Sequence, residues 1–144
     1  MNDSMPTPPG SDPGPEQMVR NLRLANDVAR RAMDQGRHPF GAILVAADHS
    51  TVLMEQGNID TVNHAESTLA RRAAEAFSEE ERWGMTLYTT AEPCVMCAGA
   101  IQLGGRTVAR VVYGLPARRL VELAGEGQAL SDRSFFQWAG NPVK

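Results

Sequence analysis

Two short segments of the 144-residue chain carry side chains that can bind a metal and move a proton. They read His64-Ala65-Glu66 and Pro93-Cys94-Val95-Met96-Cys97. Either pattern alone is common, but together they bring one imidazole, two thiols and a carboxylate. Histidine and cysteine are common zinc ligands, and a set of three leaves the fourth position to water, as in catalytic zinc sites. The two segments therefore predict a catalytic zinc site with His64, Cys94 and Cys97 as ligands.

Glu66 follows the predicted histidine ligand by two residues, so it lies near the metal without having to bind it. A carboxylate in that place can take a proton from water and deliver it to a substrate. General acid–base catalysis of this kind contributes about 10²–10⁴-fold to a rate. The alternative is a first-turn glutamate that only interacts favourably with the helix dipole. We predict the catalytic role, because a purely structural zinc site has no need of that carboxylate.

Cys94 and Cys97 are the only cysteines, which excludes a multi-disulfide scaffold and a four-cysteine zinc site. A Cys-x-x-Cys pair can also be redox-active, an alternative that would leave the nearby histidine and glutamate unused. The two remaining histidines, His38 and His49, fall in a predicted loop and a predicted turn. Each is an alternative fourth ligand, although neither has a matching partner in the sequence.

Hydrophobic patterning predicts the elements that must position these residues. Apolar residues recur at helical spacing in two segments, proline and glycine signals mark two further helices, and four short segments read as strands. The expected helices cover 16–35, 64–77, 94–103 and 116–124, and the expected strands cover 40–47, 51–56, 85–89 and 108–113. The last strand is mostly apolar, which predicts a central, buried position. This order favours an α/β fold, a three-layer α/β/α domain with a mixed sheet and the site at one end of that sheet.

Composition limits the number of domains and the kinds of binding partner that can be expected. Residues 1–15 hold five prolines and two glycines and are expected to form a disordered tail, and 16–144 to form one domain. The net charge of −3 weighs against strong binding to a polyanion. No stretch is long and apolar enough to span a membrane, and the N-terminus lacks a signal-peptide pattern. A cytoplasmic protein is therefore expected.

Residues 86–100 carry the most specific family signal, and they read TLYTTAEPCVMCAGA. With the His64 segment they resemble the cytidine/deoxycytidylate deaminase superfamily. The likeness is greatest to the branch of guanine deaminases, cytosine deaminases and tRNA adenosine deaminases. The resemblance implies a cytidine deaminase-like fold, a homodimer and a Zn²⁺-dependent hydrolytic deamination. It also implies that His64, Cys94 and Cys97 hold the zinc and that Glu66 is the proton shuttle.

The same resemblance implies three substrate contacts. Asn58 would hydrogen-bond the substrate ring or its sugar, Phe40 would line the pocket, and the Ala65 N–H would lie near the substrate. Asn58 is alternatively an ordinary turn residue, and Phe40 a core residue. Only five residues separate Asn58 from His64, a shorter step than this branch suggests.

The expected substrate is a free nucleobase, a nucleoside or a related amino-heterocycle. The alternative is a tRNA adenosine deaminase or another nucleic-acid-editing enzyme, and a third class is a zinc-stabilised binding module without activity. Several arginines could form a backbone-contacting patch: Arg71, Arg72, Arg106, Arg110, Arg118 and Arg119. Residues 114–119 contain no acid, unlike the corresponding segment of guanine and tRNA adenosine deaminases. The family's last strand and helix are either truncated or replaced by the segment with Phe135, Phe136 and Trp138.

Overall fold

A computed structural model describes residues 10–102, 108–116 and 119 of the chain. Its elements are, in order, α1 Pro15–Asp34, β1 Gly41–Val45, β2 Val52–Gly57, α2 Ala65–Ala76, α3 Glu79–Arg82, β3 Thr86–Ala91, α4 Val95–Gln102 and β4 Arg110–Leu115. All predicted elements up to β4 are present, with ends shifted by a few residues. The short α3 was not predicted. The predicted helix 116–124, apart from Pro116 and Arg119, and the aromatic residues 135–138 lie outside the described residues.

The four strands form one mixed sheet in the order β2-β1-β3-β4. The hairpin strands β1 and β2 are antiparallel, β1 and β3 are also antiparallel, and β3 and β4 run parallel. The prediction of a mixed sheet is therefore confirmed. The prediction that the fourth strand is central is not met within the described residues, because β4 pairs there only with β3 and its side chains are half-buried.

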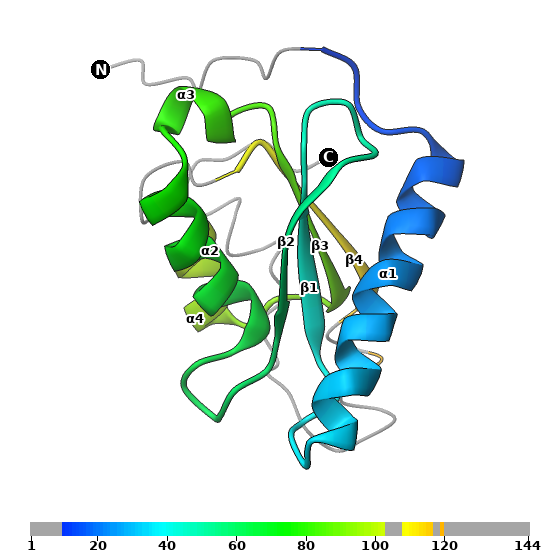
Figure 1. The fold of residues 1–144 in the computed structure, drawn as a ribbon, viewed down its shortest axis with the longest axis vertical. Helices are drawn as coiled ribbons and strands as arrows, with labels where there is room; N and C mark the ends of the chain where they lie inside the picture. The colour runs from blue at the N-terminus through cyan, green and yellow to red at the C-terminus, as the bar shows by residue number, and fades with distance from the viewer. Residues whose placement is uncertain (1–9, 103–107, 117–118, 120–144) are drawn as a thin grey trace.

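Helices cover both faces of the sheet, so the expected three layers are present (Figure 1). Helix α1 packs on one face, where its apolar side chains contact Ile43, Val45 and Tyr88 of the sheet. Helices α2 and α4 cover the other face, where Leu69 and Ile101 meet Leu87. Because side chains alternate along a strand, successive β3 residues enter opposite cores. No helix in the described ranges is both long and apolar enough to cross a membrane.

Gly41, the first residue of β1, marks the closest approach of the sheet to α1. A Cβ atom at this position would lie 2.5 Å from the Ala29 nitrogen and 2.6 Å from the Ala25 oxygen. Only glycine permits this approach without moving the helix backbone. The Gly41 N–H donates to Oγ1 of Thr90 on β3 at 3.3 Å. The start of β1 is thereby held between α1 and β3, directly after Phe40.

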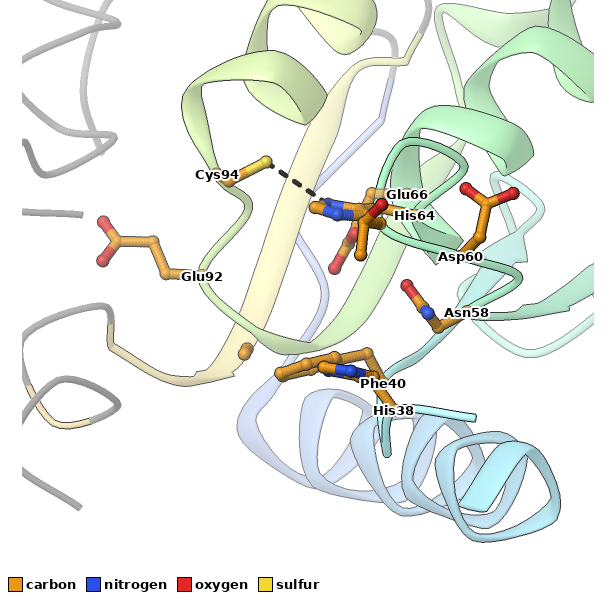
Figure 2. Close-up of a pocket in the computed structure, with 10 residues that line it drawn as sticks. His38, Phe40, Asn58, Asp60, His64, Glu66, Glu92 and Cys94 are labelled. Carbon is orange, nitrogen blue, oxygen red and sulfur yellow. Dashed lines mark hydrogen bonds between the residues drawn. The ribbon is translucent and has the colours of Figure 1, made fainter. Parts of the chain in front are cut away.

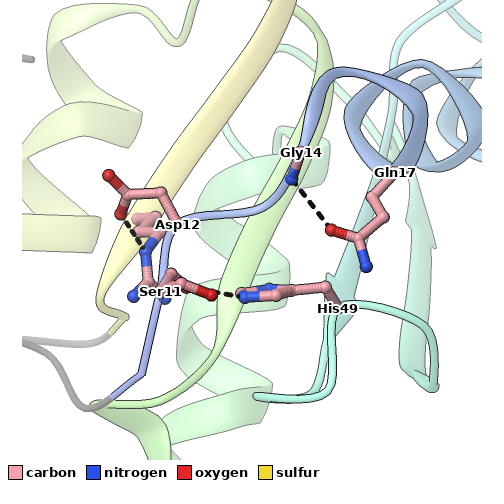
Figure 3. Close-up of polar contacts among 6 residues, drawn as sticks. Ser11, Asp12, Gly14, Gln17 and His49 are labelled. Carbon is pink, nitrogen blue, oxygen red and sulfur yellow. Dashed lines mark hydrogen bonds and ion pairs between the residues drawn. The ribbon is translucent and has the colours of Figure 1, made fainter.

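Residues 10–15 differ from the expected disordered tail, because they contact the domain (Figure 3). The Ser11 carbonyl lies 2.8 Å from Nε2 of His49, and Asp12 forms a 2.7 Å ion pair with Arg110 of β4. The Gly14 N–H donates to the Gln17 side chain at 2.8 Å at the start of α1. Composition alone did not reveal the contacts of Ser11 and Asp12, since their partners lie far away in the sequence.

Candidate functional site

His64 immediately precedes α2 and carries its imidazole to the end of the sheet beside α4. The residue has extended backbone angles, φ −71° and ψ 162°, and its side chain forms no capping hydrogen bond. Its carbonyl oxygen accepts the first helical bond, from the Thr68 N–H at 3.1 Å. The backbone thus starts the helix while the imidazole stays available as a ligand.

The two cysteines approach the same imidazole from α4. Cys94 directly precedes that helix, and Cys97 lies buried in its first turn. Nδ1 of His64 lies 3.4 Å from Sγ of Cys94 and 3.5 Å from Sγ of Cys97. All three donor atoms lie within 4.8 Å of one another. Zn–S bonds of about 2.3 Å and Zn–N bonds of about 2.0–2.1 Å place N and S about 3.5 Å apart in a tetrahedral site. The donor set therefore fits a zinc ion.

The thiols are electrostatically unequal. The pKa of Cys94 is lowered to about 5 because its sulfur accepts a hydrogen bond from Cys97, with a further contribution from His64. The same shared hydrogen bond and burial raise the pKa of Cys97. A thiolate is the form that binds metal, so binding of zinc by both cysteines would release the protons that their thiols still hold.

Glu66 lies in the first turn of α2 and is only 5% exposed. Burial raises the pKa of its carboxyl group, and this effect outweighs the lowering by a hydrogen bond from Thr89. The Thr89 hydroxyl on β3 donates to Oε1 of Glu66 at 2.5 Å. A carboxyl group can both accept and return a proton, which is the property needed in a shuttle, and a raised pKa makes it a better proton acceptor.

A pocket of about 240 Å³ connects most of the predicted site residues (Figure 2). Those lining it include His64, Cys94, Glu66, Asn58 and Phe40. Asn58 is 4% exposed, so it is a buried polar group beside the site. Two predicted residues do not line the pocket. They are Cys97, buried behind it among the donors, and Ala65, whose side chain belongs to the core.

The short step from Asn58 to His64 is closed by a compact turn. The Ile59 N–H donates a hydrogen bond to the Asn63 carbonyl at 3.0 Å. Oδ1 of Asp60 accepts hydrogen bonds from the N–H groups of Val62 and Asn63 at 2.9 and 2.6 Å. These bonds lower the pKa of Asp60. Because the turn is compact, five intervening residues suffice to bring Asn58 and His64 to the same pocket.

The sequence did not indicate four of the pocket residues, Asp60, Thr61, Ala91 and Glu92, and it indicated His38 only as an alternative metal ligand. Their nearness to Phe40, Asn58 and Cys94 in the chain was the available signal. The two alternative histidine ligands are not in the metal cluster. His38 stacks on Phe40 at the pocket wall with ring centroids 6.4 Å apart. His49 lies at the hairpin turn, with a left-handed φ of 63°.

Three arginines of the possible nucleic-acid patch already have partners within the domain. Arg71 donates to the Asn63 side chain at 3.0 Å, Arg72 donates to the Glu55 carbonyl at 2.8 Å, and Arg110 pairs with Asp12. Arg119 also takes part in an interaction, whereas Arg106 and Arg118 lie outside the described residues. Each described arginine of this set thus has a partner within the domain, although Arg71 and Arg72 remain exposed.

Comparison with known proteins agrees with this geometry. Residues 15–115 match the family model of the cytidine and deoxycytidylate deaminase zinc-binding region. The chain is 34% identical over 138 residues to a probable cytosine deaminase of Schizosaccharomyces pombe, covering 90% of this chain and 82% of that protein. It is 38% identical over 98 residues to a tRNA-specific adenosine deaminase of Agrobacterium fabrum, covering 65% of this chain and 62% of the relative. The crystal structure of a guanine deaminase from Bacillus subtilis superimposes with a TM-score of 0.61 at 27% identity, covering 87% of this chain and 78% of that one.

Proposed function

The chain belongs to the cytidine and deoxycytidylate deaminase family of zinc-dependent enzymes, and we propose that it hydrolyses the exocyclic amino group of a free nucleobase, a nucleoside or a related amino-heterocycle. Water replaces the amino group, which leaves as ammonia. One observation carries this proposal: the three-donor cluster of His64, Cys94 and Cys97 lies at a pocket that also contains the buried carboxyl group of Glu66.

The chemistry divides between the metal and the carboxyl group. A zinc ion held by His64, Cys94 and Cys97 would supply a nucleophile at neutral pH by lowering the pKa of water. Glu66 would accept the proton that the attacking water loses and deliver it to the ring nitrogen. It would then move the second proton of that water, from the newly added hydroxyl group, to the amine that departs as ammonia. Its buried position suits both transfers, since burial raises the pKa of the carboxyl group and so favours its uptake of a proton.

The remaining pocket residues would hold the heterocycle. The Asn58 amide can both donate and accept, so it can pair with ring atoms of the substrate. The stacked rings of Phe40 and His38 form an aromatic wall of the pocket, below His64 and Glu66 in Figure 2. We propose that the Ala65 N–H, at the start of α2, donates a hydrogen bond to the substrate. The buried methyl side chain of Ala65 takes no part in this role.

The charge of the pocket lining supports a small, unphosphorylated substrate over tRNA. The pocket volume of about 240 Å³ lies below the roughly 300–1,000 Å³ of pockets for drug-sized ligands and suits a single heterocycle. Its described lining includes three carboxylic acids, Asp60, Glu66 and Glu92, and neither lysine nor arginine. A phosphate entering with the substrate would meet negative charge. Deamination of adenosine in tRNA is the second candidate function, because tRNA-specific adenosine deaminases are among the relatives.

An ammonia-release assay tests the proposal directly. Zinc-loaded protein is incubated with cytosine, guanine, adenine, their nucleosides and aminotriazines, beside an inosine assay on a tRNA anticodon stem-loop, with Glu66→Gln as the blank. We expect ammonia from at least one small heterocycle, with little change between low and physiological salt. Phosphate contacts make binding steeply salt-dependent. Salt-sensitive inosine formation with every small substrate inert would assign the enzyme to tRNA instead.

We also propose a homodimer in the cytoplasm. Three exposed apolar side chains support a subunit contact near the site: Ile59 and Val62 in the turn after Asn58, and Met96 at the start of α4. The two free cysteines support a reducing compartment, since a metal site needs its thiols unoxidised. Light scattering of the zinc-loaded protein would show the predicted dimer mass.

A further inference from the structure

One contact in the site has no place in the family pattern of ligands and shuttle. Thr89 lies on β3, 23 residues from Glu66 in sequence, and its hydroxyl reaches Oε1 of that carboxyl group at 2.5 Å. Thr89 is fully buried and Glu66 nearly so. A hydrogen bond between two buried groups is not shared with water, so it restricts the carboxyl group more than a surface contact would.

The strand register explains why this threonine faces the shuttle. Side chains on β3 alternate, so Leu87 and Thr89 face α2 and α4, while Thr86 and Tyr88 face α1. Thr89 pairs with Ala42 of β1, so its backbone is held inside the sheet by a neighbouring strand. The hydroxyl therefore projects from a rigid element, which is the better support for a group that must stay in place.

We propose that Thr89 is the positioning residue for the proton shuttle, holding Oε1 of Glu66 so that Oε2 exchanges protons with the substrate. The inference rests on the proposed role of Glu66. A hydroxyl suits the position because it donates to a carboxylate and accepts from a carboxylic acid, so the contact persists in both states of the shuttle. Valine has the same shape but can do neither. Without the contact, the flexible glutamate side chain would sample orientations that do not reach the substrate.

The test compares three variants of the zinc-loaded protein: Thr89→Val, Thr89→Ser and Thr86→Val. Thr86 is an internal control, because it is an equally buried threonine of the same strand whose hydroxyl has no hydrogen-bond partner among the described residues. For Thr89→Val we expect kcat to fall about 10- to 100-fold, as for loss of a hydrogen bond to a charged group. KM should stay within about threefold, because the substrate contacts are unchanged.

Three further measurements separate positioning from a merely structural role. Thr89→Ser should restore kcat to within about threefold of the wild type, and Thr86→Val should not lower it. The solvent deuterium isotope effect on kcat should rise in Thr89→Val, as proton transfer becomes slower. Zinc content should remain at one ion per chain in all variants. Without any substrate, the loss of Tm caused by Thr89→Val should disappear in a Glu66→Ala background, since the partner is gone.

Several results would overturn the inference. They are a wild-type kcat in Thr89→Val, loss of its zinc, a rise in KM alone, or the same loss of Tm with and without Glu66. The Tm comparison needs no turnover. If the wild-type protein deaminates nothing, the proposed function fails on the activity assay, while the Thr89–Glu66 contact is still judged on its own.

Discussion

Nδ1 of His64 lies 3.4 Å from Sγ of Cys94, although the two residues are 30 positions apart in sequence. The hairpin and α2 deliver the imidazole, whereas β3 delivers the thiol, and both side chains leave the backbone just before a helix begins. Cys97 follows one turn into α4 and completes the set at 3.5 Å from the same nitrogen. Three donor atoms from the starts of two helices thus meet at one end of the sheet. A metal bound there would be accessible from the pocket.

Purified protein should contain one zinc ion per chain, and Cys94→Ser or Cys97→Ser should remove it, because two ligands bind a metal far more weakly than three. Elemental analysis measures the content, and the cysteine variants should also have a lower Tm, since metal binding adds to the free energy of folding. Met96→Ala, which changes the exposed residue between the cysteines, is the control and should keep its zinc. Zinc-free wild-type protein, purified without chelators, would contradict the assignment.

Glu66→Gln should keep zinc and fold but lose turnover by about 10²–10⁴-fold, because an amide can neither accept nor deliver the proton. Circular dichroism and elemental analysis accompany the kinetic assay. Near-native activity would mean that another group is the base. Loss of zinc in the same variant would instead make Glu66 a ligand.

Asn58→Ala should lower kcat/KM by about tenfold, the value of one hydrogen bond to the substrate. The fold should be unaffected, since the Asn58 backbone N–H still donates to the Phe40 carbonyl at 3.0 Å. Steady-state kinetics with unchanged zinc content would isolate the effect. An unaltered kcat/KM would reduce Asn58 to the turn residue that the sequence also allows.

Gly41→Ala should destabilise the protein by about 1–3 kcal/mol, because the new methyl group overlaps the α1 backbone at Ala25 and Ala29. Gly99→Ala is the matched control. A Cβ there meets nothing within 4 Å inside α4, so alanine should stabilise the helix by about 0.5–1 kcal/mol. Urea unfolding of the zinc-loaded proteins measures both, and equal effects would contradict the close approach of α1.

Asp12→Ala should cost more stability than Glu55→Ala, although each removes one ion pair of 2.7 Å. The Arg110 side chain is 11% exposed and would be left as a nearly buried charge, whereas Arg31 is 60% exposed and remains hydrated. We expect a difference of about 1 kcal/mol in the free energy of unfolding. Equal values would show that residues 10–14 do not hold the start of β4 in solution.

The sequence by itself determined the chemistry of this protein and the order of its elements. Metal ligation and proton transfer require particular side chains at short spacings, and such patterns are visible in the sequence. They made four residues recognisable: His64, Glu66, Cys94 and Cys97. The helices and most strands were predictable for a similar reason. Their apolar periodicity is local, so α1, α2 and the hairpin strands appear in the sequence within a few residues of their observed ends.

Only the tertiary structure decided which distant side chains serve those residues. Thr89 became the partner of Glu66 through strand register, and a shift of one residue would have turned its hydroxyl to the opposite core. The contact of Asp12 with Arg110 spans 98 positions, and composition alone had suggested a disordered tail. Such pairings depend on how layers pack and which strands are neighbours. These are relations between segments, and no local pattern records them.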